Sequence, residues 1–103
     1  MNVSGEKSKF GILPAQLFDL VRAVESLKGV RMEGLMTMAP KVSSANQSRP
    51  YFRELAKLRD QLCEYHKDSG RFFHLSMGMS QDFEAAIEEG ATLVRIGRTI
   101  FSD

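Results

Sequence analysis

The chain has 103 residues, enough for about one small domain, and its 43% hydrophobic content is ordinary for a globular protein. Fourteen basic and thirteen acidic side chains leave a formal charge of +1 without a Lys/Arg cluster, which argues against a nucleic-acid partner. No apolar run approaches the length of a membrane span. The single Cys63 and the lack of a secretory-type leader predict a reducing, cytoplasmic setting.

The first part of the chain predicts a strand end followed by a helix. Asn2 and Val3 are typical of the end of a strand that runs into a polar, glycine-punctuated loop. From Pro14, apolar residues recur at spacings of three and four, and Gly29 suits the exit of a helix. The expected buried stripe is Leu17, Leu20, Val21, Val24 and Leu27.

The middle of the chain predicts a buried strand and the longest helix. Val30–Met38 has a nearly continuous apolar second half, which is typical of a parallel strand covered on both faces. A polar loop follows, and residues from Arg49 to about Lys67 form an amphipathic helical pattern. Its expected inward stripe is Phe52, Leu55, Leu58 or Arg59, Leu62 and Tyr65.

The last third continues the alternation of strands and helices. Residues 72–75 predict a third strand, and 81–89 a short helix with Phe83, Ala86 and Ile87 inward. Residues 92–96 predict a fourth strand, followed by a turn of helix at 99–101. Strict alternation favours an α/β fold with a parallel sheet and right-handed crossovers.

The stretch Leu75–Ser80 carries groups suited to binding an anion. Ser76 and Ser80 offer hydroxyl groups, and Gly78 allows the backbone to approach a ligand. Ser80 is also placed to cap a helix that starts near Gln81, and a helix N-terminus attracts anions. These features predict a phosphate-sized turn after the third strand.

A second stretch, residues 94–98, resembles the first in its chemistry. Gly97 supplies another open backbone position, and Arg95 lies two residues earlier on the same strand face. Two adjacent turns would then converge on one oxyanion group. The alternative, that both glycines merely terminate strands, stays open at this point.

Other chemically suggestive residues have simpler explanations. His74 lies within an apolar strand and is expected to be packed or hydrogen-bonded rather than catalytic. Cys63 and His66 have the spacing of half a zinc site without a second pair, so no metal site is predicted. The methionines, including Met32, Met36, Met38, Met77 and Met79, are most simply core filler.

Five stretches, in this order along the chain, resemble the pyridoxal 5′-phosphate (PLP) homeostasis protein family. They are NVSGE at 2–6 with Lys9 and Gly11, GLMTM at 34–38, RPYF at 49–52, LSMGMS at 75–80 and VRIG at 94–97. That family has one barrel domain, similar to the N-terminal barrel of alanine racemase and about twice this length. The resemblance implies that residues 1–103 form the C-terminal half of a parallel, TIM-type (β/α) barrel.

The resemblance also implies a function and a site. The family binds PLP and affects vitamin B6 balance without established catalytic turnover, and barrels of this type commonly hold phosphate at the loops after strands seven and eight. Arg95 matches the arginine that faces the pyridine nitrogen, which keeps the ring neutral. The implied cofactor-binding residues are Ser76, Met77, Gly78, Ser80, Arg95, Gly97, Arg98 and Asn2.

The chain also departs from the family pattern. The Schiff-base lysine lies at the end of the first barrel strand, in the half absent here, and no lysine of this chain occupies its motif. Arg98 stands where a small hydroxyl residue is common, and Ser102 where glycine is usual. We therefore expect a truncated, non-enzymatic form with weak, non-covalent PLP affinity and no catalytic residue.

Two further expectations concern partners and an alternative activity. A half barrel exposes two sheet edges and apolar faces, so it should self-associate or pair with its missing half. The alternative function is a PLP-dependent racemase- or decarboxylase-like half barrel. Such an enzyme would need a catalytic lysine and an opposing acid or base.

Overall fold

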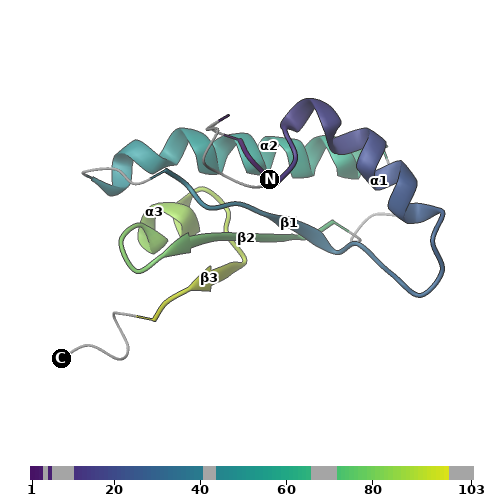
Figure 1. The fold of residues 1–103 in the computed structure, drawn as a ribbon. Coiled ribbons are helices and arrows are strands. Elements are labelled where there is room, and N and C mark those ends of the chain that lie inside the picture. The colour runs from purple at the N-terminus through teal and green to yellow at the C-terminus, as the bar shows by residue number, and fades with distance from the viewer. Residues whose placement is uncertain (4, 6–10, 41–43, 66–71, 98–103) are drawn as a thin grey trace.

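The computed structural model describes residues 1–3, 5, 11–40, 44–65 and 72–97 (Figure 1). Helices and strands alternate through this part of the chain, as the sequence predicts. In chain order the elements are η1 (Pro14–Gln16), α1 (Leu17–Glu25), β1 (Gly34–Met36), η2 (Ala45–Ser48), α2 (Arg49–Tyr65), β2 (His74–Met79), α3 (Phe83–Glu88) and β3 (Leu93–Arg95).

The strands form one parallel sheet in the order β1-β2-β3. Spatial order therefore follows chain order, with α2 connecting β1 to β2 and α3 connecting β2 to β3. This succession of parallel strands and returning helices is the repeating unit of a (β/α) barrel. The predicted α/β class with a parallel sheet is confirmed.

Residues 1–3 lie beside the end of β1. The amino group of Met1 donates to the carbonyl of Met36 at 2.7 Å, and the Thr37 hydroxyl donates to the carbonyl of Met1 at 2.8 Å. The Asn2 N–H donates to the carbonyl of Ile12 at 2.7 Å. The opening residues are thus hydrogen-bonded to the end of β1 without forming a fourth strand of the sheet.

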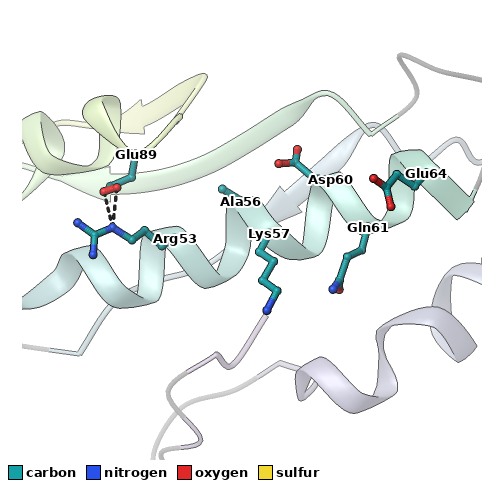
Figure 2. Close-up of a pocket in the computed structure, with 7 residues that line it drawn as sticks. All are labelled: Arg53, Ala56, Lys57, Asp60, Gln61, Glu64 and Glu89. Atoms are coloured by element: carbon teal, nitrogen blue, oxygen red, sulfur yellow. Dashed lines mark hydrogen bonds and ion pairs between the residues drawn. The ribbon is translucent and has the colours of Figure 1, made fainter.

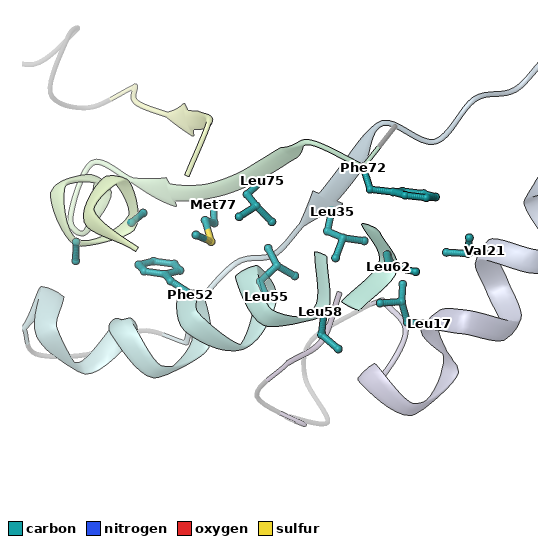
Figure 3. Packing of buried hydrophobic residues seen from close by; sticks show 12 residues of the cluster. Leu17, Val21, Leu35, Phe52, Leu55, Leu58, Leu62, Phe72, Leu75 and Met77 are labelled. Atoms are coloured by element: carbon teal, nitrogen blue, oxygen red, sulfur yellow. The ribbon is translucent and has the colours of Figure 1, made fainter. Parts of the chain in front are cut away.

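The core lies between the sheet and the helices, which Figure 1 shows on one side of the sheet. Figure 3 shows Leu35, Leu75 and Met77 of the sheet facing leucines and Phe52 of α2. On α2 the predicted inward stripe is confirmed except at Tyr65, which is 62% exposed at the helix end. On α1 only two members of the predicted stripe are buried, Leu17 and Val21.

Several predicted boundaries are wrong. β1 is confined to Gly34–Met36, the three residues that are in register with β2, and its ladder is completed by hydrogen bonds of the flanking Glu33 and Thr37. β2 instead runs on to Met79, through most of the predicted turn. α3 begins at Phe83, and Ile87 on it is 53% exposed. The predicted helical turn at 99–101 lies outside the described residues, as do His66 and Arg98.

Within the described residues, none of the helices is both long and apolar enough to span a membrane.

Candidate functional site

Ser76 and Arg95 lie on the sheet face that none of the described helices covers. Side chains alternate along a strand, and because Leu75 and Met77 enter the core, Ser76 faces the other way. Ser76 is in register with Leu93 of β3, which is 51% exposed, and Arg95 follows Leu93 by two residues. The two predicted site residues therefore belong to one surface.

A bulge in β2 sets the end of this surface. The register with β3 shifts between Ser76 and Met79, so that Met79 lies opposite Arg95. Met77 and Gly78 are both buried on the helix side, whereas Met79 is 42% exposed. The bulge therefore interrupts the strict alternation and returns Met79 to the uncovered face, beside Arg95.

The Arg95 side chain carries unused hydrogen-bonding capacity. Its Nε and Nη2 atoms are buried, and neither has a hydrogen-bond partner among the residues that the structure describes. Buried donors of a charged group are normally paired, because leaving them unpaired costs free energy. Arg95 thus keeps two buried donors without a described partner, beside the uncovered face.

Met77 and Gly78 face away from this surface. The Met77 side chain is fully buried in the core (Figure 3). Gly78 has φ +101°, and a Cβ added there would lie 2.6 Å from the Ala86 Cβ on α3. The absent Cβ of Gly78 therefore makes room for α3, and the approach of its backbone to a ligand stays a prediction. Only the backbone groups of both residues remain for a ligand.

The turn after β2 differs from the prediction at Ser80. Ser80 does not cap a helix starting near Gln81, because α3 starts at Phe83 with Asp82 as its N-cap residue. Asp82 uses its side chain to accept the Met79 N–H at 2.8 Å and the Ser48 hydroxyl at 3.1 Å. Asp82 was missed in the sequence, although an aspartate just before an apolar helical segment is a capping signal.

The remaining candidates lie at the ends of neighbouring strands. Gly97 is exposed, and a Cβ added there would meet nothing within 4 Å. Asn2 is buried, and its Oδ1 accepts the Gly5 N–H at 3.1 Å. Arg95 is the last residue of β3, whereas Ser76 lies in the middle of β2, so a common site for Asn2, Ser76 and Arg95 stays a prediction.

The uncovered face also corrects the expectation for the methionines. Met36, Met38 and Met79 are 41–42% exposed rather than core filler.

His74 Nδ1 lies 3.1 Å from the Thr92 hydroxyl oxygen, so the predicted hydrogen-bonded histidine is confirmed. In the described part of the chain no group of three or more His, Cys, Asp or Glu side chains is placed to hold a metal ion.

A hollow of about 420 Å³ lies elsewhere, along the outer side of α2 (Figure 2). Acidic and basic side chains both line it, and Arg53 Nε donates to both carboxylate oxygens of Glu89 at 2.9 Å. The lining residues are Arg53, Ala56, Lys57, Asp60, Gln61, Glu64 and Glu89. No strand residue contributes, so this hollow is separate from the surface of Ser76 and Arg95.

The fold and the site define a portion of a parallel (β/α) barrel with a candidate anion-binding edge. The chain belongs to the alanine racemase N-terminal domain family, whose family model matches residues 1–103. It is 47% identical to the pyridoxal phosphate homeostasis protein of Aquifex aeolicus, covering all of this chain and 44% of that protein. It is 42% identical to the protein of the same name from Vibrio cholerae, covering all of this chain and 42% of that protein.

Solved structures agree with the sequence comparison. PipY of Synechococcus elongatus without PLP is 32% identical with a TM-score of 0.83, covering 94% of this chain and 45% of PipY. PipY with PLP bound gives 32% identity and a TM-score of 0.81, covering 92% and 44%. The chain thus spans less than half the length of these relatives. The resemblance to the PLP homeostasis proteins and the predicted barrel-fragment fold are confirmed.

Proposed function

We propose that this chain binds PLP and serves intracellular PLP homeostasis without catalysing a reaction. Relatives that match its full length carry the name pyridoxal phosphate homeostasis protein, and the PipY structure at 32% identity has PLP bound. The observation that carries the proposal is the Arg95 guanidinium, whose Nε and Nη2 are buried and unpaired among the described residues. Arg95 shares the uncovered sheet face with Ser76, so one ligand can reach both.

In this proposal residues at the ends of two neighbouring strands bind different parts of PLP. The phosphate group would be bound by Ser76, Ser80, the backbone of Met77 and Gly78, and by Gly97 and Arg98. Asn2 would contact the ring. When bound, PLP supplies an electron-withdrawing pyridine ring, which withdraws more strongly when its nitrogen is protonated. Arg95 keeps its own proton and therefore disfavours a proton on that nitrogen. This restrains catalysis and suits a carrier role.

The direct test is a titration of the chain with PLP, followed by absorbance and intrinsic fluorescence. Arg95→Gln and Ser76→Ala should each weaken binding by about tenfold, because each removes a hydrogen bond to a charged or polar ligand group. Matched controls are Arg22→Gln and Ser26→Ala, which change exposed residues of and beside α1. Absence of saturable PLP binding by the unsubstituted chain would refute the proposal.

We further propose that binding is non-covalent. None of the lysines matches the family's Schiff-base motif, so borohydride treatment with PLP should not fix one PLP mass onto a single lysine. Peptide mass spectrometry of the treated chain measures this directly. Stoichiometric labelling of one defined lysine would contradict it.

Pairing and a cytoplasmic location also stand as proposals. The exposed Met36, Met79 and Leu93 on the uncovered face support pairing with a second copy or with the remaining barrel strands. Sedimentation velocity of the chain alone should show self-association at micromolar concentration. A strictly monomeric, stable chain would contradict pairing with a second copy.

The second candidate is a racemase-like activity. The observation that favours it is the family model itself, which describes the alanine racemase N-terminal domain. Incubating the chain with PLP and L-alanine and measuring D-alanine by chiral chromatography tests it. Turnover that disappears in Arg95→Gln would favour the enzyme over the homeostasis protein.

A further inference from the structure

The Asp82 carboxylate joins two segments that follow neighbouring strands. Its Oδ1 accepts the backbone N–H of Met79, the last residue of β2, at 2.8 Å. Its Oδ2 accepts the hydroxyl of Ser48 at 3.1 Å, in η2 between β1 and α2. Ser48 is fully buried and lies 34 residues earlier in the chain, so this contact is tertiary rather than local.

The first of these hydrogen bonds fixes the residue that faces Arg95. Met79 is in register with Arg95 on β3, and its carbonyl accepts the Asp82 N–H at 3.1 Å. Met79 therefore exchanges two hydrogen bonds with Asp82, one through the side chain and one through the backbone. These two hydrogen bonds close the turn that contains Ser80 and fix the path of the backbone after the bulge at Gly78.

The C-terminal end of α3 forms ion pairs with α2, the helix that follows Ser48. Arg49 Nη2 lies 2.9 Å from Glu88 Oε1, and Arg53 Nε lies 2.9 Å from Glu89. α3 is thus held at both ends by η2 and the first turns of α2. Removing the Asp82 side chain would free the β2–α3 turn while leaving the ion pairs at the far end in place.

We infer that Asp82 is a positioning residue for the phosphate-binding stretch Ser76–Ser80, an inference that rests on the proposed function. Its carboxylate orients the Met79–Asp82 turn, which places Ser80 relative to Ser76 and keeps Met79 beside Arg95. Asp82 does not contact the ligand. A carboxylate beside a phosphate site is electrostatically unfavourable, so its role is geometric.

An asparagine at this position would preserve the geometry without the charge. The amide Oδ1 would still accept the Met79 N–H. Its NH₂ group would donate to the Ser48 hydroxyl oxygen, which is able to accept as well as donate. Asp82→Asn is therefore the conservative variant, and Asp82→Ala the variant that removes both hydrogen bonds.

Two measurements on the 103-residue chain test the inference. The first is amide hydrogen exchange at Met79, which should accelerate at least about tenfold in Asp82→Ala and stay near the unsubstituted rate in Asp82→Asn. The second is affinity for PLP and for pyridoxal, which lacks the phosphate. Asp82→Ala should weaken PLP about tenfold with pyridoxal unchanged, and Asp82→Asn should bind PLP at least as well as the unsubstituted chain.

Each other outcome overturns the inference in a recognisable way. Equal PLP affinity in Asp82→Ala and the unsubstituted chain shows that the turn does not position the phosphate-binding groups. Equal loss in Asp82→Asn and Asp82→Ala shows that charge or folding, and not the hydrogen-bond geometry, is responsible. Equal loss for PLP and pyridoxal places the defect outside the phosphate stretch. If the unsubstituted chain binds no PLP, the proposed function itself fails, and this inference fails with it.

Discussion

Gly78 of β2 lies directly against Ala86 of α3, so closely that a Cβ on Gly78 would stand 2.6 Å from the Ala86 Cβ. Gly78 also has φ +101°, a conformation that side chains of L-residues rarely adopt. Glycine at this position allows the strand to bulge and the helix to pack on the bulge. Two independent physical effects thus oppose any larger residue.

Gly78→Ala should accordingly destabilise the chain by about 1–3 kcal/mol, through backbone strain and overpacking together. Chemical denaturation measures the free energy of unfolding. Gly97→Ala is the matched control, because a Cβ there meets nothing within 4 Å and should change stability by less than about 0.5 kcal/mol.

Combining Gly78→Ala with Ala86→Gly separates the two effects. The double variant removes the clash but keeps the unfavourable φ, so the coupling between the two substitutions should be favourable. Strictly additive changes in the free energy of unfolding would show that the close approach of Gly78 to α3 does not affect stability.

Replacing Arg95 with methionine should stabilise the ligand-free chain while weakening PLP binding. The substitution removes buried donors that are unpaired among the described residues and keeps much of the side-chain volume. We expect a gain of about 1 kcal/mol in the free energy of unfolding. Excess PLP should stabilise the unsubstituted chain by an amount set by the affinity of the chain for PLP. It should stabilise the Arg95→Met variant far less. Thermal unfolding with and without PLP measures both.

Arg22→Met on the exposed face of α1 is the control for Arg95→Met. It should change neither the free energy of unfolding nor the stabilisation by PLP. Clear destabilisation of the ligand-free Arg95→Met chain would show that the guanidinium supports the fold rather than a ligand.

Phe52 anchors α2 against the sheet and is fully buried beside Met77 (Figure 3). Phe52→Ala should cost about 3–5 kcal/mol because it leaves a cavity in the core. Phe52→Leu keeps more of the volume and should cost on the order of 1–2 kcal/mol. Denaturant unfolding provides both values.

Leu27→Ala tests whether burial explains the effect of Phe52. Leu27 is 58% exposed, and its truncation should change stability by less than about 0.5 kcal/mol. Similar losses at both positions would contradict the assignment of the core.

The ion pair between Arg53 and Glu89 should contribute little despite its favourable geometry (Figure 2). The Arg53 side chain is 64% exposed, so water and salt weaken the attraction. Arg53→Met should cost less than about 1 kcal/mol, and the difference should shrink further in 1 M salt. Urea denaturation at low and high salt measures this, with Arg22→Met as the unpaired control. A loss above about 2 kcal/mol that is insensitive to salt would contradict the estimate.

Local patterns in the sequence predicted the helices well where one face is strongly periodic. The sequence predicts α2 from Arg49 to about Lys67, and the helix runs from Arg49 to Tyr65, because spacing of three and four marks its buried stripe. The short α3 was less well placed. Its start depends on how Asp82 holds the turn after β2, which involves Ser48 far away in the chain.

For the candidate site, too, some features follow from local sequence and others from long-range packing. Local sequence specifies which groups are present, namely Ser76, Ser80, Arg95 and two glycines near the ends of predicted strands, and the resemblance to a family implies that they bind PLP. The face that each group occupies follows from long-range packing. Parallel pairing between β2 and β3 joins residues distant in the chain, and the bulge shifts the register between them. Because a single extra residue interrupts the alternation of side chains, Gly78 faces α3 whereas Met79 lies opposite Arg95, and no local pattern encodes that outcome.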